Sequence, residues 1–168
     1  MKTLSLVLAP VILVACGAAS AQDPVVPAAD QDALFHSKDP KLDANKQAVY
    51  HIFKDLLQAN HWELADKWLT KRYIQHNPNA KNGLDGVVYY FTQVRKVKPT
   101  PIPAHLSYRI VSVVAEGDMV TVAASREQPD PSDPSKKYTT TWFDQYRMVD
   151  GKADEHWDPA TKAAPPAK

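Results

Sequence analysis

The hydrophobic pattern of this chain changes its period once, at the proline-rich segment 99–103. Before this segment, apolar residues recur at the three- and four-residue spacing of amphipathic helices; after it, β-branched residues gather in short runs bounded by turn residues. A helical half followed by an extended half is typical of an α+β domain, in which helices cover one side of an antiparallel sheet. The length of 168 residues allows one such core and leaves no room for a second catalytic domain.

Three helices are predicted in the first half. The first covers about residues 44–59 with Asp43 as its N-cap, the second is short, and the third starts after Asn82, which forms a capping pair with Asp85. Residues 73–82 interrupt the helical pattern and are predicted as a loop. The apolar positions that define the helices are Val49, Ile52, Phe53, Leu56 and Leu57, then Trp62, Ala65, Trp68 and Leu69, then Leu84, Val87, Val88, Phe91 and Val94.

At least four antiparallel strands are predicted in the second half. Neighbouring runs are joined by the tight turns Glu116-Gly117-Asp118 and Asp150-Gly151, so the strands should form a meander. Residues 127–137 contain three prolines and are predicted as a long loop. The strands are expected at residues 105–115, 119–125, 138–149 and 152–157.

The first 21 residues have the features of a secretory signal peptide. They contain Lys2, an apolar run over residues 4–14, and a terminal Ala19-Ser20-Ala21. The apolar run is too short to span a bilayer as a helix. Cys16, the only cysteine, follows Leu13-Val14-Ala15, a pattern that resembles the lipobox of bacterial lipoproteins. Two products stay open: a soluble exported protein, periplasmic or secreted, and a lipid-anchored one.

The segments that flank the predicted core lack periodicity. Residues 22–41 are rich in Pro, Ala and Asp and are predicted as a flexible leader, and residues 159–168 as a disordered tail. The packed domain is therefore expected at residues 42–158.

Charge and motif content exclude several classes of function. The 20 Lys and Arg residues are balanced by 19 Asp and Glu, which leaves a net charge of +1 and no basic cluster for nucleic-acid phosphates. The histidines form no H-x-H or H-x-x-x-H pair, so no metal site is predicted. No P-loop, G-x-G-x-x-G or G-x-S-x-G motif is present, so nucleotide binding and serine hydrolysis lack support and no cofactor is expected.

Two polar segments suggest a relationship. The first is Tyr73-Ile74-Gln75-His76-Asn77-Pro78, followed by Gly83 and Gly86; the second is residues 143–152, FDQYRMVDGK, running into Glu155-His156-Trp157-Asp158. Both resemble motifs of SnoaL-like proteins, a polyketide cyclase family of the nuclear transport factor 2-like superfamily, and the last segment is similar to that of a subgroup of aldol-condensing enzymes. The resemblance implies a cone-shaped, cystatin-like fold, in which a bent antiparallel sheet wraps around a helix and leaves a pocket at its open end.

The first segment supplies two candidate site residues. The resemblance places His76 and Asn77 at the mouth of the cone, where a histidine can exchange a proton near neutral pH. The alternative is that both residues cap the ends of neighbouring helices.

Asp144 lies in the middle of a predicted strand, where aspartate is disfavoured. Alternation puts it on one face with Trp142, Tyr146 and Met148, so it projects into the cone if those residues line it, as a general acid or base would. The alternative is an ion pair or hydrogen bond across strands, for instance with Arg109, Arg126 or Arg147.

The last predicted strand poses a conflict. Alternation puts His156 and Asp158 on one face and Glu155 and Trp157 on the other, unless a bulge intervenes. Simple patterning sends His156 outward and Trp157 inward, whereas the resemblance makes Asp158 the proton-transfer residue. We therefore expect the strand to bend toward the mouth at Trp157-Asp158. The alternative is that His156 and Asp158 only solvate this strand.

The remaining candidate residues would form the walls of a mostly hydrophobic pocket. Aromatic side chains at such spacings also build ordinary cores, so the prediction concerns the group rather than any one member. The expected substrate-binding residues are Tyr73, Asn77, Tyr90, Phe91, Trp142 and Trp157.

The resemblance implies a cofactor-independent enzyme that acts on a hydrophobic carbonyl compound through an enol or enolate, giving an aldol-type cyclisation or an isomerisation. Asp158 or Asp144 would move the proton, while His76, Asn77 and His156 would stabilise the oxyanion. The alternative is a non-catalytic small-molecule-binding or dimeric interaction module of the same fold. The resemblance also implies a homodimer, and membrane contact is expected only with a lipid on Cys16.

Overall fold

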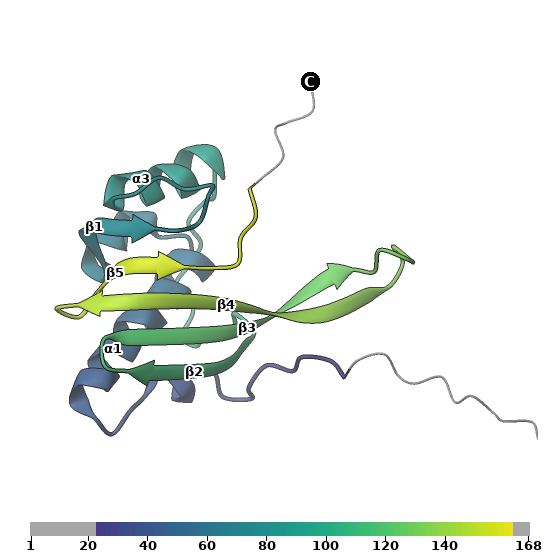
Figure 1. Cartoon of the computed structure of the whole chain (residues 1–168), viewed down its shortest axis with the longest axis horizontal. Coiled ribbons are helices and arrows are strands. Elements are labelled where there is room, and N and C mark those ends of the chain that lie inside the picture. The colour runs from purple at the N-terminus through teal and green to yellow at the C-terminus, as the bar shows by residue number, and fades with distance from the viewer. Residues whose placement is uncertain (1–22, 163–168) are drawn as a thin grey trace, which may run out of the picture.

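A five-stranded sheet with the order β1–β5–β4–β3–β2 forms the centre of the fold, and helices cover one of its faces (Figure 1). This computed structural model describes residues 23–162. The strands are β1 (Leu69–Gln75), β2 (Ile110–Glu116), β3 (Met119–Pro129), β4 (Lys137–Val149) and β5 (Lys152–Trp157). The helical elements are η1 (Asp32–Phe35), α1 (Pro40–His51), η2 (Ile52–Gln58), η3 (Trp62–Leu64), α2 (Ala65–Trp68), α3 (Leu84–Tyr89) and η4 (Tyr90–Val94). The predicted α+β class is confirmed.

The sheet is mixed rather than wholly antiparallel, which corrects the prediction. Strands β2 to β5 form the expected antiparallel meander, but β1 adds to the edge of β5 in parallel orientation. The sequence pattern conceals β1 because its two buried residues, Leu69 and Tyr73, are four positions apart, a spacing that favours a helix. For the same reason Leu69, predicted in the second helix, instead begins a strand after α2 ends at Trp68.

The hairpin of β3 and β4 is longer than predicted and projects beyond the other strands (Figure 1). Its ladder continues to the pairing of Pro129 with Lys137. The loop between β3 and β4 is therefore shorter than the predicted loop 127–137 and consists of residues 130–136. Proline is tolerated there because it ends its strand.

The first helix starts at Pro40, earlier than predicted, and Asp39 rather than Asp43 is its N-cap. The Asp39 carboxylate accepts hydrogen bonds from the backbone N–H groups of Lys41 and Leu42. Proline at the first helical position and aspartate before it form a strong start signal. Asp43 instead accepts a hydrogen bond from the Ser37 N–H at 2.8 Å.

Residues 25–39 are held against the domain, which differs from the predicted flexible leader. The Phe35 side chain is fully buried, the Ala28 N–H donates to the Ile110 carbonyl at 2.8 Å, and the Ser125 hydroxyl donates to the Val25 carbonyl at 2.7 Å. The predicted signal peptide and Cys16 lie outside the described residues, as does most of the predicted tail. Within residues 23–162, no helix combines the length and apolar character needed to cross a membrane.

The turn between β1 and α3 is closed by backbone contacts that position the candidate site. The Gly83 N–H donates to the Tyr73 carbonyl at 3.0 Å, and Asn82 accepts from the Gln75 N–H at 2.8 Å instead of capping α3 as predicted. Gly86 lies against the same turn, where a Cβ atom would come within 2.6 Å of the Lys81 carbonyl oxygen. A side chain at this position would therefore displace the turn.

The core lies between the helices and the inner face of the sheet. Phe53 of η2 is fully buried, and its ring centroid lies 6.4 Å from that of Tyr146 on β4 and 5.1 Å from that of Tyr108. Helix α1 packs over β2, β3 and β5. These contacts fix η2 across the sheet and leave space toward α3.

Replacing Phe53 by alanine should lower the free energy of unfolding by about 3–5 kcal/mol, because it opens a cavity at the centre of these contacts. The matched control Tyr89→Ala, on an exposed position of α3, should change it by no more than about 0.5 kcal/mol. Urea denaturation of both variants measures the difference, and equal effects would contradict this description of the core.

Candidate functional site

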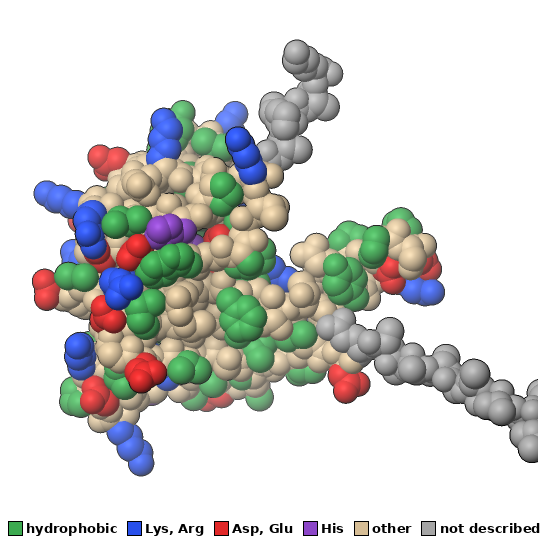
Figure 2. Space-filling view, viewed as in Figure 1, with side chains coloured by type: hydrophobic (Ala, Val, Ile, Leu, Met, Phe, Trp, Pro, Cys, Tyr) green, Lys and Arg blue, Asp and Glu red, His purple; other side chains and the backbone are tan. Residues whose placement is uncertain are grey.

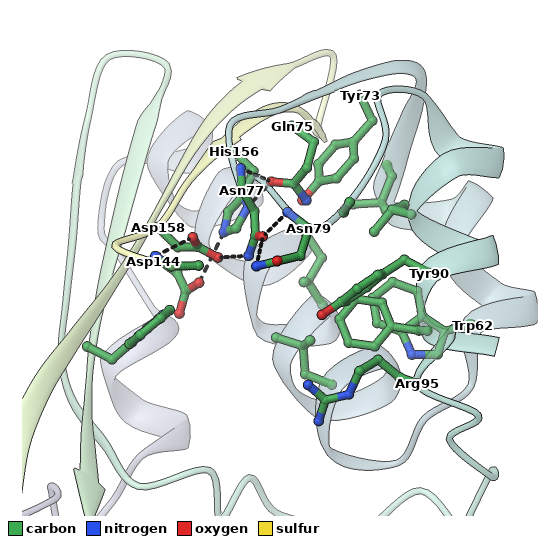
Figure 3. A pocket seen from close by; sticks show the side chains of 18 of the residues that line it. Trp62, Tyr73, Gln75, Asn77, Asn79, Tyr90, Arg95, Asp144, His156 and Asp158 are labelled. Carbon is green, nitrogen blue, oxygen red and sulfur yellow. Dashed lines mark hydrogen bonds and ion pairs between the residues drawn. The ribbon is translucent and has the colours of Figure 1, made fainter. Parts of the chain in front are cut away.

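A cavity of about 410 Å³ opens between the inner face of the sheet and the helices η2, α3 and η4, with polar side chains gathered on one side (Figure 3). This volume is in the range of small-molecule sites. Five predicted wall residues line it: Tyr73, Asn77, Tyr90, Phe91 and Trp142. Trp157, the sixth, does not appear in the lining, and its position is described below.

Asp144 and His156 form a buried pair on the cavity floor. His156 Nε2 lies 3.0 Å from Asp144 Oδ1, and the two residues are only 6% and 7% exposed. Because Tyr146 is the direct partner of His156 across β4 and β5, Asp144 is its diagonal neighbour on the same face. The alternative ion pair of Asp144 with an arginine is not found among the described residues, where its partner is His156.

Gln75 contacts the second ring nitrogen of His156. Its Oε1 accepts a hydrogen bond from the Asn77 N–H at 3.3 Å, which identifies this atom as the amide oxygen, and it lies 2.6 Å from His156 Nδ1. An oxygen acceptor there requires a proton on Nδ1. Nε2 then faces a carboxylate oxygen, and this second contact also requires a proton. The Asp144–His156 pair therefore carries one shared proton in addition to the one on Nδ1.

Asp158 is held beside this pair by a separate set of donors. Its Oδ2 accepts from the Asn77 side-chain amide at 2.8 Å and its Oδ1 from the Ala160 N–H at 2.9 Å. Asn77 is itself oriented by Asn79, whose backbone N–H donates to Asn77 Oδ1 at 2.9 Å. Both bonds are accepted by the carboxylate oxygens, which fixes the position of this carboxylate in the cavity lining.

Asp144, His156 and Asp158 converge at one point. One oxygen or nitrogen atom of each lies within 4.8 Å of the others. Such a set can also surround a cation, which the spacing of the histidines did not suggest, and the absence of a metal stays a prediction. A cation and the shared proton of the Asp144–His156 pair would compete for the same lone pairs.

Two tyrosines with neutral hydroxyl groups, Tyr73 and Tyr146, lie near the acidic cluster. Burial raises the pKa of Tyr73 strongly, and the negative charges of Asp144 and Asp158 raise it further. Burial and Asp144 likewise raise the pKa of Tyr146 well above its ordinary value. Because a phenol with a raised pKa keeps its proton at neutral pH, both hydroxyls are available as hydrogen-bond donors and not as bases.

His76 lies outside the cavity, so its predicted place at the mouth of the cone is wrong. Strand β1 runs through Gln75, and alternation turns Gln75 and Asn77 inward and His76 outward. The imidazole donates to, or shares a proton with, Glu155 Oε1 at 2.8 Å and stacks on Trp157 with ring centroids 5.0 Å apart. The His76 contact and the nearby Arg147 lower the pKa of Glu155.

Trp157 points outward and His156 inward, the opposite of simple patterning. The reason is a register shift in β5: Met148 pairs with Ala153 and Arg147 with Glu155, which leaves Asp154 as an extra residue. Such a bulge reverses the faces of all later residues in the strand. The predicted bend at Trp157-Asp158 is therefore replaced by a bulge three residues earlier.

Several lining residues were not singled out from the sequence. Gln75 and Asn79 lie in a segment predicted as a loop, in which side chains are not expected to alternate between two faces. Arg95 directly follows the last residue of η4. Only the alternation of Gln75, Asn77 and Asn79 could have indicated a shared face. The cavity residues not predicted as site residues include Trp62, Gln75, Asn79, Arg95, Tyr108 and Arg126.

We expect the hydrogen bond with Gln75 to favour a proton on Nδ1 of His156. Long-range proton–nitrogen NMR distinguishes this state, because a protonated nitrogen gives a different shift from a bare one. In Gln75→Leu, which removes the oxygen acceptor, the preference for Nδ1 should be reduced, while the control Gln93→Leu on an exposed position leaves it unchanged. A bare Nδ1 in the wild-type protein would contradict the proposed hydrogen-bond network.

Comparison with solved structures supports the fold. A candidate polyketide cyclase from Acidithiobacillus ferrooxidans aligns with a TM-score of 0.51 and 16% identity over 68% of this chain and 86% of that one. A candidate SnoaL-like polyketide cyclase from Jannaschia sp. CCS1 aligns with a TM-score of 0.51 and 17% identity over 74% and 91%. TerC, crystallised with polyporic acid, aligns with a TM-score of 0.50 and 18% identity over 70% and 92%. A comparison with curated protein sequences found no match.

Comparison with family models agrees with these alignments. The model of the SnoaL-like domain matches residues 49–156, which include η2, the sheet except for Trp157 at the end of β5, and the polar cluster except for Asp158. The fold of this chain is that of the nuclear transport factor 2-like structures to which it is similar. The chain therefore belongs to the SnoaL-like domain family.

Proposed function

We propose that this protein is a cofactor-independent acid/base enzyme that acts on a hydrophobic carbonyl compound through an enol or enolate, in an aldol-type cyclisation or an isomerisation. The observation that carries this proposal is the convergence of a proton-bearing pair, Asp144–His156, and a proton acceptor, Asp158, on one point of a cavity. Enolisation needs both kinds of group within hydrogen-bond reach of the same carbonyl compound.

In the proposed reaction Asp158 removes a proton from the carbon next to the carbonyl group. The electron pair of the broken C–H bond moves toward the carbonyl oxygen, where negative charge develops. The Asp144–His156 pair stabilises this oxygen with its shared proton, and Gln75 keeps His156 in the required orientation. Return of the proton from Asp158 to another carbon gives isomerisation. In the aldol branch the enolate carbon attacks a second carbonyl carbon, whose C=O electron pair moves to oxygen, and the resulting alkoxide takes the proton from Asp158.

The surroundings of the cluster favour such chemistry. Aromatic side chains line part of the cavity, and Asp144 and His156 are buried in its floor, so charge–dipole interactions with an oxyanion formed beside them are less screened than in solution. The Tyr73 hydroxyl, kept neutral by its raised pKa, is a further donor near Asp144 and Asp158. The names of the polyketide cyclase candidates and the crystallisation of TerC with polyporic acid support an organic small-molecule substrate for the same fold.

Deuterium exchange tests the proposed chemistry without a known substrate. In D2O the protein should catalyse exchange of the protons next to the carbonyl of 2-tetralone, followed by NMR. Asp158→Asn and Asp144→Asn should each lower the catalysed rate by about a hundredfold or more, because each removes a proton-transfer group. Asp150→Asn is the matched control, since Asp150 lies in the exposed turn after β4.

Wild-type protein that gives only the uncatalysed rate would contradict the enzymatic proposal and favour a binding module of the same fold. Variants that retain the wild-type rate would contradict the assignment of Asp144 and Asp158. Circular dichroism of each variant establishes that a lost rate does not come from unfolding.

We also propose that two copies associate through the outer face of the sheet. Hydrophobic side chains lie among charged ones on this face (Figure 2), and Val114 and Phe143 are 64% and 52% exposed there. Exposed apolar side chains of this size mark association surfaces when they gather. Light scattering during size exclusion should give the mass of a dimer, and Phe143→Glu should give that of a monomer; a wild-type monomer would contradict the proposal.

Export also stays a proposal, supported by Lys2, the apolar run over residues 4–14 and the small residues before residue 22. The choice between a soluble product and a lipid-anchored one depends on whether Cys16 is retained and modified.

A further inference from the structure

We propose that the substrate carries a carboxylate that binds between Arg95 and Arg126, away from the Asp144–His156 pair. The inference rests on the proposed function, because it assigns a substrate class and an orientation to the same cavity. Both arginines line the cavity, and Figure 3 shows Arg95 reaching into it apart from the acidic cluster.

The pairing of β3 with β4 places Arg126. Val122 is opposite Asp144, and Arg126 is opposite Thr140, four residues further along the hairpin. Four residues of strand correspond to about 13 Å. The backbone positions of Arg126 and Asp144 are therefore well separated on the same inner surface, with Trp142 between them. The cavity thus has an acidic end and a basic end.

The charge of these two arginines is not neutralised by any carboxylate among residues 23–162. The other three arginines of the chain are all paired: Arg72 with Asp154, Arg109 with Glu127, and Arg147 with Asp118 and Glu155. Arg126 lies over the Trp142 ring, 3.6 Å from its centroid, which leaves the N–H groups at the edge of the guanidinium free to donate. Two unpaired guanidinium groups in one cavity fit an anionic ligand group.

Tyr108 lines the cavity together with both arginines and with Asp144. Its pKa is raised by burial and by Asp144, while the positive charges of Arg126 and Arg95 oppose this rise. The hydroxyl of Tyr108 is therefore under the influence of both the acidic and the basic groups of the cavity.

The aromatic walls of the cavity provide a second observation. Trp62 and Phe91 both line the cavity and stack with ring centroids 3.8 Å apart, which forms a flat wall for a ring system.

A carboxylate is the anionic group that these features favour. The planar guanidinium matches its two oxygens, and the aromatic walls favour a ring that carries it. Asp144 and Asp158 would repel a carboxylate at the other end, so the charges of the cavity admit one orientation and oppose the reverse. The substrate class is therefore a cyclic keto acid, with its carbonyl at the acidic cluster.

Calorimetric titration with two ring compounds that differ in one group tests this inference. The probes are 1-hydroxy-2-naphthoate and its neutral amide, 1-hydroxy-2-naphthamide. At about 50 mM NaCl the wild-type protein should bind the acid at least about tenfold more tightly than the amide. Raising NaCl to about 500 mM should weaken binding of the acid more than binding of the amide.

Arg95→Gln and Arg126→Gln should each reduce the preference for the acid, and the double variant should abolish it. Lys96→Gln and Arg109→Gln are the matched controls, since each removes one positive charge outside the cavity lining, and both should keep the preference. Equal affinity of the wild-type protein for the two probes, failure to bind either, or a preference that survives in the double variant would overturn the inference.

The outcome is separable from the proposed chemistry. 2-Tetralone has no carboxylate, so its exchange by the wild-type protein reports on the acid/base cluster alone. Catalysed exchange together with equal affinity for naphthoate and naphthamide would refute the carboxylate site and leave the enzymatic proposal intact. A clear preference for naphthoate without exchange would support an acid-binding protein that lacks the chemistry.

Discussion

The hydrogen bond between Asp144 and His156 is the contact on which the rest of the site depends. Both side chains are more than nine-tenths buried, and a buried pair of ionisable groups is tolerated only if further hydrogen bonds satisfy the remaining polar atoms. Gln75 supplies that further bond from the edge strand. The polar pair thus connects β1, β5 and β4, and its geometry requires that all three strands adopt the observed register.

Two irregular features of the sheet produce this register. The bulge at Asp154 turns His156 inward, and the parallel pairing of β1 places Gln75 directly beside His156. Asp154 itself is satisfied by Arg72 and Thr70 of β1, so the bulge also ties the edge strand to its neighbour. Fold and site are therefore coupled, because the contacts that hold β1 in place also orient the imidazole.

The cavity combines opposite charges at separate places with apolar walls between them. Charges exposed to water are screened over short distances, whereas partly buried charges such as these are screened less. A molecule that binds there is oriented by its own charges as well as by its shape. In the proposed orientation the acidic cluster contacts the carbonyl group of the ligand, and Arg95 and Arg126 bind its anionic group.

The sequence predicts the fold class well because its two periods are clear and separated by a proline-rich segment. The meander and its turns follow from β-branched runs and from Gly117 and Gly151, and the inward position of Asp144 follows from alternation. Strand β1 could not be predicted, since its buried residues have helical spacing, and without it neither Gln75 nor the outward position of His76 could be derived.

The faces of His156 and Trp157 depend on a bulge, and no residue type in β5 marks one in advance. The pairing of arginines is likewise a property of the folded chain. Sequence alone cannot tell that Arg72, Arg109 and Arg147 find carboxylates while Arg95 and Arg126 reach the cavity unpaired.

A crystal structure with 2-naphthol, an aromatic analogue of the enol of 2-tetralone, tests the central claim most directly. The account predicts that the naphthol oxygen lies within hydrogen-bond distance of the Asp144–His156 pair, with a neighbouring ring carbon facing Asp158. A naphthol bound outside the cavity, or one whose oxygen faces Arg95 instead, would contradict it.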